Sequence, residues 1–219
     1  MENSIFTFLV GTIAQLLFSA RLIIQWFKSE KAGKVLSPII FWQLSLLAAF
    51  MLLIYGIMRK DFAIMLGQIV VYFIYIRNLQ LKNAWKSLPK LIRIIAALAP
   101  FAAGIWLLSD VSNNLYDILY NKEIPLALMI WGSAGQIIFT LRFLYQWYYS
   151  EHQGDSVLPN GFWVISLVGS VMILSYAITR KDPVLFAGQA CGAFVYARNL
   201  MLGLNGKSLF SALLKRKKP

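Results

Sequence analysis

The chain has 219 residues, of which 59% are hydrophobic and only 14% are charged, and it carries a formal net charge of +12. This composition excludes an ordinary soluble domain and predicts an all-α integral membrane protein. The basic residues lie in short clusters between apolar stretches and in the C-terminal tail, so we expect no nucleic-acid partner. A single cysteine and a single histidine provide no ligand set for a metal or redox cofactor, and none is expected.

Seven apolar stretches follow one another, each long enough to cross a bilayer as a helix of about 20 residues. Helices are expected because lipid offers the backbone no hydrogen-bond partner, and no stretch shows the alternation of a barrel strand. The predicted helices run from Ile5 to Phe27, from Pro38 to Met58, from Phe62 to Leu81, from Leu91 to Leu108, from Ile124 to Tyr149, from Leu158 to Thr179 and from Pro183 to Leu202.

An internal repeat organises these helices. Residues 11–81 align without a gap on residues 132–202, and about 29 of the 71 paired positions are identical. Because one helix separates two triplets, both repeats are expected to have the same orientation in the membrane, in a parallel 3+1+3 plan. The predicted parts are a first three-helix repeat in 1–81, a basic linker with a single helix and an outer loop in 82–123, a second three-helix repeat in 124–205 and a basic tail in 206–219.

The distribution of lysine and arginine predicts the orientation, because cytoplasmic loops carry an excess of these residues. Lys28, Lys31 and Lys34 follow the first helix, and a second basic cluster follows the third. The loop at 110–123, on the other side, holds three acids and one lysine. The N-terminus is therefore expected outside and the C-terminus in the cytoplasm, although the acidic loop at 151–155 departs from the rule.

Polar and aromatic residues are retained between the two repeats, whereas apolar residues exchange freely. On a helical wheel those of the first helix share an arc of roughly 140°, which predicts a polar face toward the bundle interior and two matching half-sites. The candidates for binding an anionic head group are Arg21, Arg142, Arg77, Arg198, Asn78 and Asn199, and those for lining a path are Gln15, Gln136, Gln25, Gln146, Gln68, Gln189, Tyr75 and Tyr196.

The two arginines of the spanning helices allow two interpretations. Arginine near the centre of a span costs at least about 2.5 to 3.5 kcal/mol, so Arg21 and Arg142 are functional candidates. Their planar forks suit phosphate or carboxylate. Alternatively, Arg21 fixes helix packing by reaching Glu30 of the same repeat or a backbone carbonyl.

Retained tryptophans and glutamates also have alternative roles. The tryptophans either anchor helices at the membrane interface or stack on a sugar ring. The glutamates either cap or pair locally, or couple protons to transport. These residues are Trp26, Trp147, Trp42 and Trp163, with Glu30 and Glu151.

No catalytic constellation is present, and no catalytic residue is expected. Metal-ligand spacing, a phosphate-binding Gly-rich loop, a nucleophile–histidine pair and a dinucleotide fingerprint are all missing. The retained acids Glu30 and Asp61, like Glu151 and Asp182, are expected at opposite faces of the membrane, which is too far apart for an acid–base pair.

Three motifs occur in both repeats and carry a family likeness: R-x-x-x-Q-W-x-x-S-E from Arg21, R-K-D from Arg59 and Y-x-R-N-L from Tyr75. With them the chain resembles the lipid A biosynthesis N-terminal domain family, the membrane region of lipid-A-disaccharide synthase, over about 65% of its length. Its helix plan is also similar to that of PQ-loop and SWEET-type transporters, although the sequence has no Pro-Gln dipeptide.

The resemblance implies a link to lipid A disaccharide synthesis. We expect a bacterial inner-membrane protein that binds, and translocates, a phosphorylated or glycosylated lipid intermediate of envelope synthesis. Alternatives are a membrane scaffold for a cytoplasmic glycosyltransferase, a SWEET-like transporter of small solutes, and lipid-A-disaccharide synthase activity itself. That last activity needs a soluble nucleotide-sugar domain, which no stretch here provides, so an enzyme is the least favoured. The expected partners are the membrane, an anionic lipid or glycolipid, and a glycosyltransferase if the scaffold alternative holds.

Overall fold

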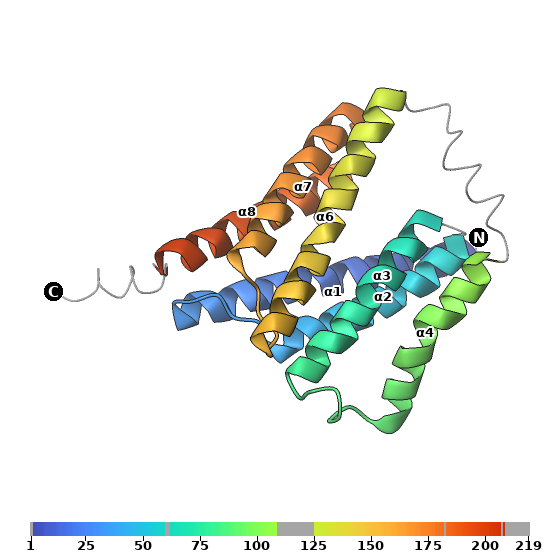
Figure 1. The fold of residues 1–219 in the computed structure, drawn as a ribbon. Coiled ribbons are helices and arrows are strands. Elements are labelled where there is room, and N and C mark those ends of the chain that lie inside the picture. Colours follow the sequence, from blue (N-terminus) through green and yellow to red (C-terminus); the bar gives the residue numbers. More distant parts are fainter. Residues whose placement is uncertain (1, 60–61, 109–124, 182, 207, 209–219) are drawn as a thin grey trace. The chain divides into compact units, whose positions relative to one another are not determined.

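The computed structural model describes residues 2–59, 62–108, 125–181, 183–206 and 208 (Figure 1). These residues form seven α-helices and no strand, which confirms the all-α prediction. The helices are α1 (Glu2–Ala32), α2 (Ile39–Arg59), α3 (Phe62–Leu81), α4 (Lys90–Leu108), α6 (Leu126–Gln153), α7 (Asn160–Arg180) and α8 (Pro183–Asn205).

Four helices are long and apolar enough to cross a membrane, which supports the membrane class. They comprise Ile5–Ala32, Ile39–Met58, Leu126–Gln153 and Asn160–Arg180. The 3+1+3 plan, the inner membrane and the orientation of the termini stay predictions. The predicted orientation depends on the Arg-Lys-Asp turns, the loop at 110–123 and the basic tail. Most of these residues lie outside the described part of the chain.

Two helices extend beyond their predicted C-terminal ends, because a polar segment continues the helix after the apolar stretch. Helix α3 has the predicted bounds, but α1 and α6 each run several residues past the end of their apolar stretch. Each ends at a glycine in the left-handed conformation, Gly33 at φ 70° and Gly154 at φ 65°. Such a glycine closes a helix because it lacks the Cβ that makes this conformation costly. Hydropathy alone therefore placed these two ends too early.

The chain forms two compact units. Unit 1 consists of Met1–Arg21 with Ile39–Glu123, and unit 2 consists of Leu22–Pro38 with Ile124–Pro219. This division differs from the predicted repeat boundaries, because the C-terminal part of α1 and the loop after it belong to unit 2. Helix α1 has 31 residues and a length of about 46 Å, which exceeds the roughly 30 Å of a hydrocarbon core.

The interior of unit 1 is built from aromatic residues of α2 and α3. Phe41 and Trp42 meet edge to face with ring centroids 4.8 Å apart, and Trp42 lies 6.1 Å from Tyr75. Gly11 of α1 allows a close approach to Tyr55, since a Cβ on this glycine would lie 2.7 Å from the ring. These contacts join α1, α2 and α3.

Unit 2 repeats these contacts at equivalent positions of α6, α7 and α8. Phe162 and Trp163 meet at 4.8 Å, and Trp163 lies 6.1 Å from Tyr196. A Cβ on Gly132 would lie 2.6 Å from the ring of Tyr176. Identical residues 121 positions apart therefore make the same packing contacts.

Candidate functional site

Arg21 lies inside unit 1, where it is only 4% exposed. Its Nη1 donates to the Ser45 hydroxyl at 2.6 Å and to the Tyr75 hydroxyl at 3.2 Å. The guanidinium also lies over the rings of Phe18 and Phe41, at 4.5 and 5.0 Å from their centroids. Hydroxyl dipoles and ring faces both stabilise a cation without neutralising its charge.

Arg142 occupies the equivalent place in unit 2 and is 5% exposed. Its guanidinium lies 3.3 Å from the centroid of Phe139 and 4.7 Å from that of Phe143. The rings of Phe162 and Tyr196 lie 5.8 and 5.5 Å away. Desolvated cation–π contacts are worth up to about 2 kcal/mol each. Phe139 is equivalent to Phe18, so both arginines lie against a ring three residues before them. The spacing of Phe18 and Arg21, about one helical turn, could have indicated this contact.

The carboxylate of Glu30 pairs with an arginine of the other repeat. In unit 2, Arg198 donates from Nε to Glu30 Oε1 at 2.5 Å and from Nη2 to Oε2 at 3.2 Å. The proposed clamp between Glu30 and Arg21 is therefore corrected, because nine residues separate these two along α1, about 13 Å of helix rise. The Ser208 hydroxyl adds a hydrogen bond to the Glu30 carbonyl oxygen at 2.5 Å.

The retained glutamines at the ends of α1 and α6 hold the following loops in place. Gln25 Nε2 donates to the Ser29 hydroxyl at 2.9 Å and to the Leu36 carbonyl at 3.1 Å. At the equivalent positions, Gln146 donates to Ser150 at 2.7 Å and to the carbonyl of residue 157 at 2.9 Å. The Gln-x-x-x-Ser part of the long motif thus has a local structural role beside any role along a path.

The asparagines of α3 and α8 are buried, and one of them joins this network. Gln25 Nε2 also donates to Asn199 Oδ1 at 2.9 Å, while Asn199 donates to the Val195 carbonyl at 3.0 Å. Asn78 makes the same backbone contact to Ile74 in unit 1, at 2.8 Å. In unit 2 the buried end of α1 is therefore attached to α8 by an amide pair and an ion pair.

The four retained tryptophans fall into two classes. Trp42 and Trp163 are completely buried in the unit interiors, so the membrane-anchor interpretation is wrong for both, since an anchor needs an exposed ring. Trp26 and Trp147 donate from Nε1 to Glu30 and Glu151 of the next turn, at 3.1 and 2.8 Å.

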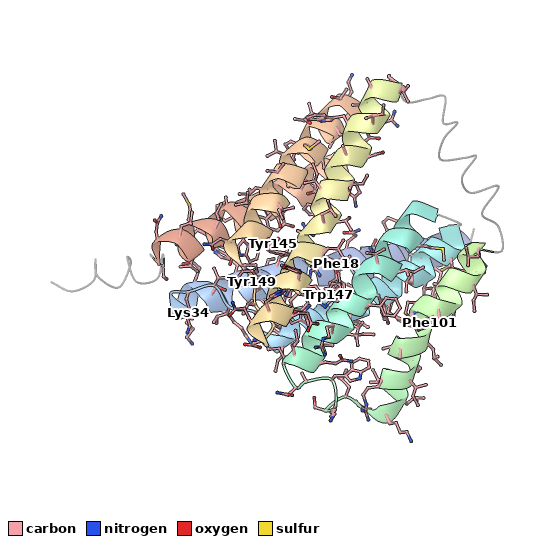
Figure 2. All side chains as sticks on the ribbon, in the orientation of Figure 1. Phe18, Lys34, Phe101, Tyr145, Trp147 and Tyr149 are labelled. Carbon is pink, nitrogen blue, oxygen red and sulfur yellow. The ribbon has the colours of Figure 1, made fainter. Side chains whose placement is uncertain are left out.

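Trp147 is 42% exposed and lies on the opposite side of α6 from Tyr145 and Tyr149, which are exposed as well (Figure 2). Aromatic side chains of this kind are typical of a membrane–water interface. The anchor interpretation therefore fits Trp147, and stacking on a sugar stays a prediction.

The remaining candidate residues differ in exposure and in contacts. Gln15 and Gln136 are exposed, which departs from the interior position expected from the wheel. Arg77 and Arg198 are half-buried, and Arg77 Nη1 donates to Gln80 Oε1 at 3.3 Å. Among the described residues, no group of three or more histidine, cysteine, aspartate and glutamate side chains is placed to hold a metal.

Gln68 and Gln189 occupy equivalent positions but differ in the hydrogen bonds of their amide oxygens. The sequence gives the reason. Gln189 Oε1 accepts a hydrogen bond from the Ser170 hydroxyl at 3.0 Å. Gln68 Oε1 is buried without a hydrogen-bond partner among the described residues. The position equivalent to Ser170 in unit 1 is Ala49. The missing hydroxyl accounts for the unsatisfied amide oxygen.

Two exchanges at this position test the explanation. Ser170→Ala is expected to lower the free energy of unfolding by about 1 kcal/mol, because it leaves Gln189 Oε1 unpaired, and Ala49→Ser to raise it by a similar amount. Thermal unfolding of the purified protein, followed by tryptophan fluorescence, measures both. Ala48→Ser, at the neighbouring buried position, is the control and should bring no gain; equal effects at 48 and 49 would contradict the explanation.

The apolar helices of the described residues fit a membrane protein. The chain belongs to the Lipid A Biosynthesis N-terminal domain family, whose model matches residues 10–80 and residues 131–201. The predicted resemblance is thereby confirmed. No solved structure matches the chain.

Three curated relatives share the name lipid-A-disaccharide synthase. The chain is similar to a lipid-A-disaccharide synthase of Chlamydia muridarum, with 31% identity over 202 residues that cover 88% of this chain and 33% of the relative. The lipid-A-disaccharide synthase of Chlamydia pneumoniae is 29% identical over 197 residues, with 88% and 33% covered. That of Chlamydia felis is 28% identical over 202 residues, with 88% and 32% covered. The chain thus spans about a third of the length of the curated relatives it matches.

Proposed function

We propose that the chain is a membrane component of lipid A biosynthesis that binds, and moves between the membrane leaflets, a phosphorylated or glycosylated lipid intermediate. The observation that carries the proposal is the pair of arginines, Arg21 and Arg142, held 4% and 5% exposed in helices apolar enough to span a membrane. Ionised groups at such positions are costly and mark binding sites by default.

The surroundings of the two arginines support a phosphate rather than a neutral ligand. The Arg21 guanidinium is held by two hydroxyls, and ring faces surround that of Arg142. An anion that approached either group would meet a buried positive charge. In an apolar environment this attraction is far stronger than in water. The fork of arginine matches two phosphate oxygens at once, which lysine does not.

Binding is tested on the purified full-length protein with monophosphoryl lipid A as the probe. The double variant Arg21→Gln and Arg142→Gln is expected to bind at least tenfold more weakly, since the loss of one charge-assisted hydrogen bond is worth about 1.5 to 3 kcal/mol. Lys86→Gln, which removes an exposed charge, serves as the control and should bind like the wild type. Unchanged binding by a folded double variant would remove the proposed site.

Movement of the lipid is a separate measurement. Proteoliposomes with a fluorescent lipid A analogue in one leaflet are expected to lose leaflet asymmetry faster with the wild-type protein than with the double variant. Binding without any acceleration would contradict the translocation part and leave the binding part in place.

A membrane scaffold is the second candidate, since the curated relatives carry the name of an enzyme. The similar synthases are about three times as long as the part that aligns with this chain, and in the scaffold alternative a soluble glycosyltransferase performs the reaction. This alternative predicts that a glycosyltransferase co-purifies with the protein and that the protein alone translocates nothing. Reconstitution with and without the soluble enzyme separates the two candidates.

A further inference from the structure

One buried donor in unit 2 points to the chemistry of a ligand. The indole of Trp163 is completely buried, and its Nε1 has no hydrogen-bond acceptor among the residues that the structure describes. By contrast, Nε1 of Trp131 donates to Ser175 at 2.8 Å, and that of Trp147 donates to Glu151. Buried donors are normally paired, because an unpaired one gives up its hydrogen bond to water without a replacement.

A cation lies in the same aromatic cluster. Trp163 stacks on Tyr196 with ring centroids 6.1 Å apart and an interplanar angle of 30°. The guanidinium of Arg142 lies over that same ring, 5.5 Å from its centroid. An acceptor beside the indole edge would therefore lie in the field of a buried positive charge. This field favours a negatively charged oxygen over a neutral one.

The equivalent cluster of unit 1 is arranged differently. There Arg21 donates to the hydroxyls of Ser45 and Tyr75. In unit 2 the hydroxyl of Ser166 donates to the Phe162 carbonyl at 2.6 Å, and the guanidinium of Arg142 lies 3.3 Å from the ring centroid of Phe139. Ser45 makes the same hydrogen bond to the Phe41 carbonyl in unit 1, at 2.5 Å. The two clusters differ in how close a ring lies to the guanidinium, 4.5 Å for Phe18 and 3.3 Å for Phe139.

We infer that unit 2 binds an oxyanion, a phosphate group, that accepts a hydrogen bond from Trp163 Nε1 and pairs with Arg142. The inference rests on the proposed function and assigns the phosphate to one of the two half-sites. The same chemistry has two sources, the head group of a lipid and free inorganic phosphate. The donor is the edge of the indole, so the ring faces keep their packing against Tyr196.

Trp163→Phe tests the inference, because it removes the N–H and keeps an aromatic ring. The variant is expected to bind monophosphoryl lipid A about 10- to 150-fold more weakly, as for the loss of one hydrogen bond to a charged group. Its thermal unfolding midpoint without lipid should fall through the loss of buried ring volume alone, whereas benzothienylalanine at position 163, which removes the N–H at constant size, should not lower it. Trp131→Phe, at an exposed tryptophan outside the cluster, is the control and is expected to bind within about twofold of the wild type.

Competition with millimolar inorganic phosphate distinguishes the two sources. If phosphate displaces the lipid from the wild type and not from Trp163→Phe, the site recognises the oxyanion alone. If phosphate displaces no lipid and the substitution still weakens lipid binding, the site recognises the lipid head group. Equal lipid affinities of variant and wild type would overturn the inference and leave the proposed function standing. No lipid binding by the wild type would overturn the proposed function itself. If Trp163→Phe fails to fold, benzothienylalanine at position 163 removes the N–H at constant size.

Discussion

Glu30→Gln is expected to lower the free energy of unfolding by about 2 to 3 kcal/mol. The carboxylate is 1% exposed and binds the Arg198 guanidinium through both oxygens, so the substitution leaves a positive charge without its counterion. Breaking a buried ion pair usually costs about 3 to 5 kcal/mol, and the 14% exposure of Arg198 reduces that cost. Chemical unfolding of the detergent-solubilised protein, monitored by tryptophan fluorescence, measures the loss.

Two further variants separate this ion pair from general effects of charge. Lys31→Gln changes an exposed charge in the next position of α1 and should alter stability by at most about 0.5 kcal/mol. Arg198→Lys keeps the charge and loses the bidentate geometry, so its effect should lie between those of the other two. A Glu30→Gln protein as stable as the wild type would show that the pair does not hold α1 to α8.

Trp42→Ala is expected to cost about 3 to 5 kcal/mol, the range for truncating a large aromatic residue in a packed interior. Trp42 has no exposed surface and packs against Phe41 and Tyr75, so its loss leaves a cavity in unit 1. The measurement is the thermal unfolding of the purified protein in detergent.

Trp147→Ala is the matched control for the same change of side chain. Trp147 is largely exposed on α6 and makes one hydrogen bond, to Glu151, so the expected loss of stability is about 1 kcal/mol. Equal losses at the two positions would mean that Trp42 is not a core residue. A larger loss at Trp147 in lipid than in detergent would support its role at the membrane interface.

Local sequence signals predicted the helices well and their ends less well. Apolar stretches located every described helix, and the bounds of α3 are as expected. The ends of α1 and α6 were missed, because Ser29 and Glu30 read as polar loop residues while the helix continues to the glycine stop at Gly33. Backbone conformation, rather than hydropathy, determines where such a helix ends.

The sequence identified the retained polar residues but not which of them pair in the structure. Comparison of the two repeats identified the retained arginines, glutamines and glutamates, because polar residues of membrane helices are rarely exchangeable. The pair of Glu30 with Arg198 joins residues 168 positions apart, and nothing local indicates it. The burial of Trp42 and Trp163 was missed for a similar reason, since a membrane anchor and a core residue have the same sequence signature.

The division of α1 between the two units matters for any attempt to express only one part of the chain. A fragment that begins at residue 124 contains Arg198 and Asn199 but lacks Glu30 and Gln25, the side chains that bind them. Split-protein or permutation experiments should therefore keep residues 22–38 with the C-terminal half.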